Sequence, residues 1–314
     1  MNTTPQLFIG TGGWQYFIIP GRDPLREYSR IFNFVEVNVT FYREVSIDEV
    51  ANWRRRVPDN FIFSVRAPKI VTHDYMLKPV KPVINAMDYI SEVADILNSN
   101  VIVLETPSKL AISKKLLKEF VESIDLNDKY LAVEPRGAIS KEAIEYMKNK
   151  DMIYISDLSK EEPPYYNSEI GYSRIFGPGK HNRYQFTRKE LKRIHRRATN
   201  APVKMILMCF HGIRMYADAG RLRYLDLYGD FPKNKPPYGL DAVREELSRD
   251  MKFPATRDEI IQHEGWKVIP LNEKDDIHIG DILSWLPPKI YYSVDEVINE
   301  LKKLKIFRDL AGGS

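Results

Sequence analysis

Short apolar runs alternate with amphipathic stretches along most of the chain. The apolar runs predict eight strands, over residues 7–10, 34–39, 61–65, 101–104, 130–133, 152–155, 172–176 and 203–210. Helical periodicity lies between them, over residues 24–32, 46–56, 81–97, 113–124, 140–148 and from Thr187 onward. Eight strands separated mostly by helices predict an α/β fold, a (β/α)8 TIM-type barrel, although a doubly wound open sheet would show the same alternation.

The strand over residues 34–39 carries polar side chains at every second position. Val35, Val37 and Val39 alternate with Glu36, Asn38 and Thr40. A half-exposed strand would produce this pattern by pointing its polar side chains at water. Because helical stretches flank the strand on both sides, we expect instead that both faces are buried and that the polar side chains find partners inside.

Composition limits the class of protein. Of 314 residues, 43% are hydrophobic and 29% are charged, as in soluble globular proteins. No apolar run approaches the roughly 20 residues of a membrane span, and the N-terminus lacks a signal-peptide core, so we expect a cytoplasmic protein without membrane contact. The single cysteine, Cys209, excludes an internal disulfide and a multi-cysteine zinc site. It lies in an apolar strand and is interpreted as inert core.

Four spaced motifs carry a resemblance to a known family. They are Gly-Thr-x-Gly-Trp-x-Tyr from Gly10, Glu-x-Asn-x-Thr-Phe-Tyr-Arg from Glu36, Phe63–Lys69 with Thr72-His73, and Ala-Val-Glu-x-Arg ending at Arg136. Residues 7–230 thereby resemble the YecE-like family, number 72 among the domains of unknown function. The resemblance implies a barrel similar to those of xylose isomerases and type-IV AP endonucleases, and it implies the fold more firmly than an activity.

The predicted strand ends define a list of candidate site residues. In a parallel barrel, reactive groups lie at the C-terminal ends of the strands. The residues at these ends are Trp14, Glu36, Asn38, Thr40, His73, Glu105, Glu134, Arg136, Asp157 and His211. Acidic and imidazole side chains together suit a divalent metal, so we predict manganese, magnesium or zinc bound by Glu36, His73, Glu105, Glu134, Asp157 and His211. Alternatively, these carboxylates pair with Arg66, Lys69 and Arg136 in a metal-free polar network.

Three segments depart from the family pattern. The chain reads Arg174-Ile175-Phe176-Gly177 where relatives have a histidine at the third position. It has His211-Gly212 where relatives carry two asparagines, and Glu105 where glutamine is usual. One imidazole is lost, and an imidazole and a carboxylate are gained. The chain therefore reads as a divergent branch, whose chemistry can differ from that of its relatives.

No nucleotide cofactor is expected. Gly10-Thr11-Gly12-Gly13 follows a strand, but Gln15 leaves the dinucleotide-binding fingerprint incomplete. A tight turn under Trp14 explains the glycines. Neither a Walker loop nor a Gly-x-Ser-x-Gly elbow occurs.

A basic segment indicates a polyanionic partner. Its cations are Lys180, Arg183, Arg188, Lys189, Lys192, Arg193, Arg196 and Arg197, against the single acid Glu190. On a helix from Thr187 they form adjacent i,i+4 stripes of like charge, whose repulsion nucleic acid would relieve. The alternative is a solvated outer helix of the barrel. DNA is the favoured partner.

The composition changes after residue 230. Residues 231–252 read as a Pro-rich linker followed by a helix, and residues 253–308 as a small α-rich module with a short strand over 266–270 and a helix over 277–286. Capping boxes at Thr256 and Ser293 open two of its helices. The module could contact DNA, dock a protein or cover one end of the barrel. Residues 311–314 read as an expression remnant.

These observations predict a metal-dependent hydrolase that cleaves nucleic acid, such as a repair endonuclease. Its catalytic residues would be Glu36, His73, Glu134 and Asp157, and its substrate-binding residues Trp14, Asn38, Thr40, Tyr42, Arg66, Lys69, Arg136 and Arg174. Arginine suits bidentate phosphate contacts. Two alternatives stay open: a nucleic-acid-binding protein without catalysis, and a sugar-isomerase-like enzyme acting on a small phosphorylated substrate with Glu134 or His73 as base.

Overall fold

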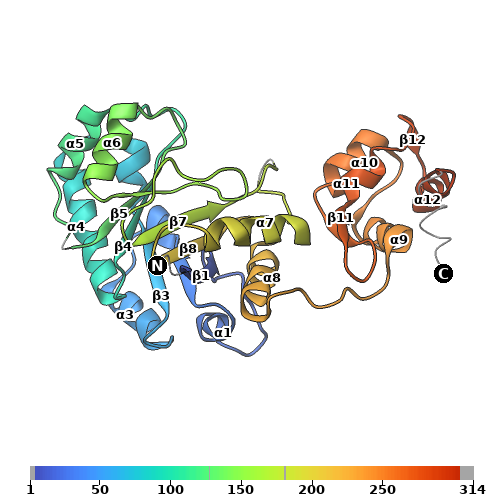
Figure 1. Ribbon diagram of the computed structural model, residues 1–314, viewed down its shortest axis with the longest axis horizontal. Helices are drawn as coiled ribbons and strands as arrows, with labels where there is room; N and C mark the ends of the chain where they lie inside the picture. Colours follow the sequence, from blue (N-terminus) through green and yellow to red (C-terminus); the bar gives the residue numbers. More distant parts are fainter. Residues whose placement is uncertain (1–3, 127, 180–181, 305–314) are drawn as a thin grey trace.

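The chain folds into a parallel barrel with a small module beside it (Figure 1). The computed structural model describes residues 4–126, 128–179 and 182–304. Eight strands form one sheet in the order β6-β5-β4-β3-β2-β1-β8-β7. A parallel bridge between Ser156 and Ser173 joins the β6 and β7 ends of this order, and the backbone N–H of Arg174 donates to the carbonyl of Ser156 at 3.1 Å. The predicted barrel is confirmed, and the open sheet is excluded.

The strands alternate with helices around most of the barrel. The strands are β1 Gln6–Thr11, β2 Phe34–Val37, β3 Ile62–Arg66, β4 Val101–Glu105, β5 Tyr130–Glu134, β6 Ile153–Tyr154, β7 Ile170–Ile175 and β8 Met205–Phe210. The larger helices are α1 Pro24–Ile31, α3 Ile47–Arg55, α4 Lys81–Ile96, α5 Lys114–Val121, α6 Lys141–Asn149, α7 Arg188–Thr199 and α8 Met215–Tyr228. Within the described ranges, no helix has the length and apolar character needed to cross a membrane.

Side chains of β2 show how the two faces of the sheet are used. Val35 and Val37 belong to the hydrophobic cluster that includes the surrounding helices, whereas Phe34 belongs to a second cluster inside the barrel. Glu36 has no exposed surface. The expectation of a strand buried on both faces is therefore confirmed, and a solvated face is excluded.

Three local features differ from the sequence-based prediction. The strand predicted over residues 34–39 ends at Val37, because Asn38 has helical backbone angles and opens the one-turn helix α2, Val39–Tyr42. A π-helical turn, η1 (Ile70–Asp74), follows β3, and α8 follows β8; the sequence predicted neither. The apolar residues of α8 do not lie on one face, since Leu222 is buried while Leu227 is exposed. The helix therefore lacks the one-sided hydrophobic pattern on which the prediction of helices relies.

The C-terminal module has a hydrophobic core of its own. Its elements are α9 Gly239–Asp250, β9 Ala255–Thr256, α10 Arg257–Glu264, β10 Val268–Pro270, β11 Asp276–His278, α11 Ile279–Leu283, β12 Ile290–Tyr291 and α12 Val294–Lys302. Val243, Ile260 and Val297 pack in a cluster separate from that of the barrel. The helix predicted over 277–286 begins too early, because residues 276–278 form the strand β11 and the helix α11 starts at Ile279. Residues 305–308 and 311–314 lie outside the described part.

The module docks on the barrel through Asp276 of β11. Its carboxylate accepts a hydrogen bond from the backbone N–H of Arg188 at 2.9 Å and from Nη2 of Arg221 at 2.6 Å. The carbonyl of Gln185 accepts from Nε2 of His278 at 2.8 Å. The side chain of Asp276 is nearly inaccessible, so removing its charge would leave Arg188 of α7 without a carboxylate and Arg221 of α8 with only Asp218, at 3.5 Å.

We expect Asp276→Asn to loosen the module from the barrel. Breaking a largely buried ion pair typically costs about 3 kcal/mol, which should lower the urea midpoint and expose residues 229–238 to limited proteolysis. Glu273→Gln is the matched control, because it breaks only the solvent-exposed pair with Lys233. Equal proteolysis of the two variants would contradict this account of docking.

Asp218 of α8 is a buried acid beside this contact. Its carboxylate lies 3.4 Å from the backbone N of Phe186 and 3.5 Å from Nη1 of Arg221. Burial raises the pKa of Asp218 to about 7, and the nearby Arg221 and Phe186 N–H oppose only part of the rise. An aspartate in an unfolded chain titrates near pH ~4, so the folded state holds this proton more tightly. The free energy of unfolding therefore falls as the pH rises from about 4 to about 7.

Asp218→Asn should remove this fall. Each unit of pKa difference corresponds to about 1.4 kcal/mol, so urea unfolding between about pH 4.5 and about pH 7.5 should show a clearly flatter profile in the variant. Asp230→Asn is the control, because hydrogen bonding to Lys192 lowers the pKa of Asp230 and its removal cannot flatten the profile in this way. A wild-type profile that rises over this range would refute the assignment.

Candidate functional site

A single buried arginine gathers three carboxylates inside the barrel. Arg174 of β7 has a side chain only 1% exposed. Its Nη2 lies 3.0 Å from Oε1 of Glu36, its Nη1 lies 2.6 Å from Oε2 of Glu105, and Nη1 also contacts Glu134. Glu105 and Glu134 are the last residues of β4 and β5, and Glu36 is the residue before the last in β2. Four strand ends are thereby joined by one guanidinium.

Two further arginines complete the network. Nη2 of Arg66 lies 2.6 Å from Oε2 of Glu105, and Nη1 of Arg136 lies 2.7 Å from Oε1 of the same residue. Nε of Arg136 is 3.4 Å from Oε1 of Glu134. Three guanidiniums thus face three carboxylates, so their formal charges cancel. This arrangement agrees in part with the metal-free alternative: Arg66 and Arg136 belong to the network, but Arg174 takes the central position and Lys69 pairs with Asp74 instead.

Burial and charge act in opposite directions on the acid at the centre. Burial would raise the pKa of Glu105, but the guanidiniums of Arg174, Arg66 and Arg136 outweigh it and hold that pKa below its usual value. Burial, together with the charge of Arg174, lowers the pKa of the Arg66 guanidinium. Glu105 is therefore a carboxylate at neutral pH, as the network requires.

His211, directly after β8, borders the network as a neutral imidazole. Burial and then the charges of Arg174, Arg66 and Arg136 lower its pKa well below the usual value. Nε of Arg174 donates to its Nε2 at 3.2 Å. Because arginine has only donors, Nε2 must accept, and the ring proton is on Nδ1. A Cβ at Gly12 would lie 2.5 Å from this Nδ1, so only glycine leaves room for the ring.

One group of side chains has the spacing of a metal site. Glu36, Cys209 and His211 bring one ligand atom each within 4.8 Å of one another and form a candidate buried metal-binding group. However, Oε1 of Glu36 and Nε2 of His211 are both bound by Arg174, and Tyr172 donates to Oε2 of Glu36 at 2.7 Å. Burial, followed by the charge of Glu36, raises the pKa of the Cys209 thiol, which stays protonated. A divalent cation would have to displace a buried guanidinium, so these residues do not fit a metal in this arrangement.

The other predicted ligands do not join this group. Glu105 and Glu134 are held by arginines, as described. Asp157 accepts hydrogen bonds from the backbone N–H groups of Phe176 (3.1 Å) and Gly177 (3.2 Å), which anchors the end of β7. His73 lies in η1, with Nδ1 2.8 Å from the hydroxyl of Thr72, and burial lowers its pKa.

The predicted substrate-binding residues take different positions. Asn38 donates to the carbonyl of Gly12 at 3.0 Å and lies 3.4 Å from Nη1 of Arg66. The Thr40 hydroxyl faces the carbonyls of Val37 (3.0 Å) and Arg66 (2.6 Å), and Trp14 is buried edge-on against Trp53. These three shape the loops. Lys69 and Tyr42 are exposed at the rim, and Lys69 lies 3.5 Å from Asp74.

Sequence reasoning missed Tyr172, Ser64 and Phe176. The hydroxyl of Tyr172 bridges Glu36 and Ser64, with Ser64 Oγ at 2.8 Å. The ring of Phe176 stacks on His211 at 4.7 Å. The signal for the first two was available, since Tyr172 precedes Arg174 by two residues and Ser64 precedes Arg66 by two. Residues two apart on a strand share a face.

Four of the seven described cations of the basic segment have partners within the protein. Arg188 pairs with Asp276, Lys192 with Asp230, and Arg193 and Arg197 donate to the carbonyls of Ser159 and Leu158. Arg183, Lys189 and Arg196 are exposed and make no ion pair with any described residue. Lys180 lies outside the described residues. The helix predicted from Thr187 is confirmed as α7, with a capping box at Thr187 and Glu190.

Replacing Arg174 should expose how strongly the network depends on it. Arg174→Met leaves Glu36 and Glu105 buried without their main partner, and breaking such a pair costs about 3 to 5 kcal/mol. The loss relative to wild type should grow from about pH 5 to about pH 8, because unpaired buried carboxyl groups have raised pKa values and resist ionisation. Urea unfolding across this range measures it.

The double variant Glu36→Gln/Arg174→Met should recover part of the stability, since it removes a charge of each sign. Arg136→Met is the matched control, because this guanidinium is 40% exposed and solvent compensates for its loss. An Arg174→Met protein as stable as wild type at every pH would refute mutual neutralisation.

Comparison with known proteins agrees with this architecture. Residues 8–226 match the family described as protein of unknown function DUF72. The UPF0759 protein YecE of Escherichia coli strain K12 is 32% identical over 74 residues, 23% of this chain; the match spans only 27% of that relative's length.

Solved structures show the same barrel. A DUF72 family protein from Thermotoga maritima has a TM-score of 0.57 at 18% identity, covering 71% of this chain and 99% of that one. A DUF72 family protein from Enterococcus faecalis V583 also reaches 0.57, at 14% identity, with 72% and 99% covered. An AP endonuclease, family 2, from Brucella melitensis is a distant likeness, with a TM-score of 0.43 at 12% identity over 71% and 99%. With most of its barrel matched by one family model, the chain belongs to the DUF72 family.

Proposed function

We propose that the C-terminal mouth of the barrel binds single-stranded nucleic acid without a metal. The observation that carries the proposal is the position of Arg136. Its guanidinium is fixed by Glu105 and Glu134, lies 5.2 Å from the ring centroid of Phe176, and is still 40% exposed. It is the most exposed cation of the network. A phosphate oxygen can reach it without disturbing the buried pairs.

Exposed aromatic side chains come from the loops around the same mouth. Tyr16, in the loop after β1, is 81% exposed, and Tyr42, after β2, is 75% exposed. Tyr75 follows β3 and is also exposed, and Ile213 follows β8. Large apolar groups left in water at one end of a barrel mark a binding surface. Aromatic rings beside cations suit unpaired bases, which stack on the rings while their phosphates meet the cations.

Charge favours binding over metal-dependent cleavage. Three of the four acids predicted to hold a metal, Glu36, Glu105 and Glu134, are already neutralised by three guanidiniums. A phosphate adds negative charge next to Arg136, whereas a divalent ion would add positive charge next to Arg174. Because Glu134 is paired with Arg136 and Arg174, its carboxylate is less available as the base of an isomerase.

Alanine substitutions at the mouth test the proposal. Arg136→Ala should weaken binding of a labelled single-stranded oligonucleotide and reduce the salt slope by about 0.7, the value for one phosphate contact on a single strand. Tyr42→Ala should weaken it roughly 5- to 100-fold, which corresponds to the loss of one stacked base. Fluorescence anisotropy over a salt series from about 50 to about 300 mM measures both effects.

Matched controls lie at the opposite side of the barrel. Lys148→Ala on α6 removes an exposed cation, and Tyr228→Ala at the end of α8 removes an exposed ring. Neither should change affinity. Binding that is indifferent to salt, or an Arg136→Ala protein that binds like Lys148→Ala, would refute the proposal. Manganese and EDTA should leave affinity and the oligonucleotide unchanged; manganese-dependent cleavage lost in Glu134→Gln would establish the hydrolase instead.

A further inference from the structure

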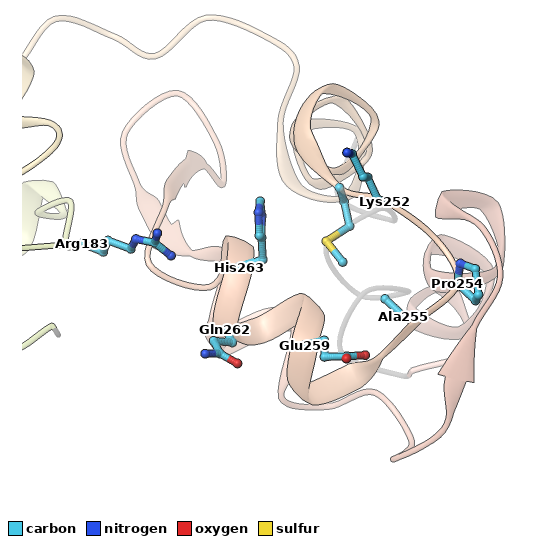
Figure 2. Close-up of a pocket in the computed structure, with 8 residues that line it drawn as sticks. Arg183, Lys252, Pro254, Ala255, Glu259, Gln262 and His263 are labelled. Carbon is cyan, nitrogen blue, oxygen red and sulfur yellow. The ribbon is translucent and has the colours of Figure 1, made fainter. Parts of the chain in front are cut away.

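A cavity of about 330 Å³ lies where the loop after β7 meets the C-terminal module. Figure 2 shows Arg183 reaching toward it from the barrel side, while its other labelled side chains belong to α10 and to the segment before it. The lining residues are Arg183, Met251, Lys252, Pro254, Ala255, Glu259, Gln262 and His263. Both parts of the chain are therefore needed to form the cavity.

The polar groups of this cavity are mostly unpaired donors. Arg183 and Lys252 are exposed and make no ion pair with any described residue, unlike Arg188 and Lys192 on α7. Nδ1 of His263 lies 2.7 Å from Oε1 of Glu264, and donation to that carboxylate leaves Nε2 of the neutral ring as an acceptor. The one acid is Glu259, and its Oε2 accepts from the N–H and hydroxyl of Thr256 at the start of α10.

Two cations against one acid give the cavity lining a net positive charge. Hydrogen bonds from Thr256 lower the pKa of Glu259, so this acid is a carboxylate, and its Oε2 faces the start of α10. The two cations and the amide of Gln262 remain available as donors to a ligand. Arginine and lysine side chains both bind phosphate groups in proteins, arginine through two parallel N–H donors and lysine as a point charge.

The loop that carries Arg183 connects this cavity to the barrel mouth. The carbonyl of Asn182 accepts from the backbone N–H of Ile213, in the loop after β8, at 3.1 Å. Three residues further on, the N–H of Gln185 donates to the carbonyl of Trp266 in the module at 3.3 Å. One short loop therefore touches the rim on one side and the module on the other.

We infer that this cavity is a second phosphate-binding site, which receives the backbone of a strand already bound at the barrel mouth. The inference rests on the proposed function and assigns the module a role in it. A cavity of this volume exceeds one phosphate group and admits a phosphate with part of its sugar. The module extends the binding site along the strand, and Asp276 keeps it in position.

Oligonucleotide length separates the two sites. The double variant Arg183→Ala/Lys252→Ala should bind a strand of about 4 nucleotides like wild type, because such a strand occupies only the mouth. A strand of about 15 nucleotides should bind at least about tenfold more weakly, with a salt slope reduced by about 1.4 for two lost phosphate contacts. Lys141→Ala/Lys148→Ala on α6 is the control with the same change of charge.

The outcomes distinguish this inference from the proposed function. If Arg136→Ala weakens both lengths and the double variant weakens neither, the cavity is not a phosphate site and the mouth proposal stands. If Arg136→Ala has no effect while the double variant weakens the long strand, the mouth proposal fails. Inorganic phosphate or a mononucleotide that competes at the cavity as strongly as the long strand would show that it serves small phosphates, which overturns the inference. Both altered residues are exposed, and equal urea midpoints confirm that the variants fold.

Discussion

The fold depends on keeping a buried guanidinium neutralised. Arg174 lies inside the barrel, where an uncompensated charge would be strongly destabilising. It is tolerated because carboxylates from three other strands reach it in one layer. Removing Arg174 leaves Glu36 without its guanidinium, whereas Glu105 keeps Arg66 and Arg136, so the layer depends most on Arg174.

On the strands that form this layer, an apolar or aromatic residue inside the barrel is followed two residues later by a charged residue. Phe34 is followed two residues later by Glu36, Val103 by Glu105, Ala132 by Glu134, and Tyr172 by Arg174. Side chains two apart share a face, so on these four strands an apolar or aromatic residue lies below a charged one. The apolar layer excludes water from below, and Arg136 is the most exposed cation of the network. A ligand therefore meets a cation that is already held in place, which reduces the ordering entropy lost on binding.

The sequence predicted the barrel and the positions of these acids, but it could not predict their partners. Glu36 and Glu134 stand at recognisable strand ends, and the alternation of strands with helices sets which end of the barrel they share. Nothing in their spacing shows that Arg174 contacts both, because barrel closure alone determines which interior positions lie in one layer. Whether such acids bind a metal or arginines depends on that contact.

Local geometry limited the prediction in a second way. Asp157 and Thr40 satisfy the strand-end rule in sequence, yet their side chains turn to backbone groups within a few ångströms. The partners of the basic stripe on α7 were missed for a similar reason, since the acids that pair with it come later in the chain. Asp226 binds His195 at 2.9 Å, and Asp230 binds Lys192 at 2.8 Å. A charge pattern along one helix cannot show which elements cover it.

Two positions that the resemblance predicts to depart from the family pattern are neighbours in space. The rings of Phe176 and His211 stack on each other at 4.7 Å. The phenyl ring has no metal-binding atom, and it lies 5.2 Å from the guanidinium of Arg136 and 5.5 Å from that of Arg174. An imidazole at that position would add a polar donor or acceptor between the two cations; a phenyl ring instead offers both of them its π face. His211 accepts from Arg174 through Nε2. The two side chains thus both contact arginines of the network, Phe176 through its ring and His211 through its ring nitrogen.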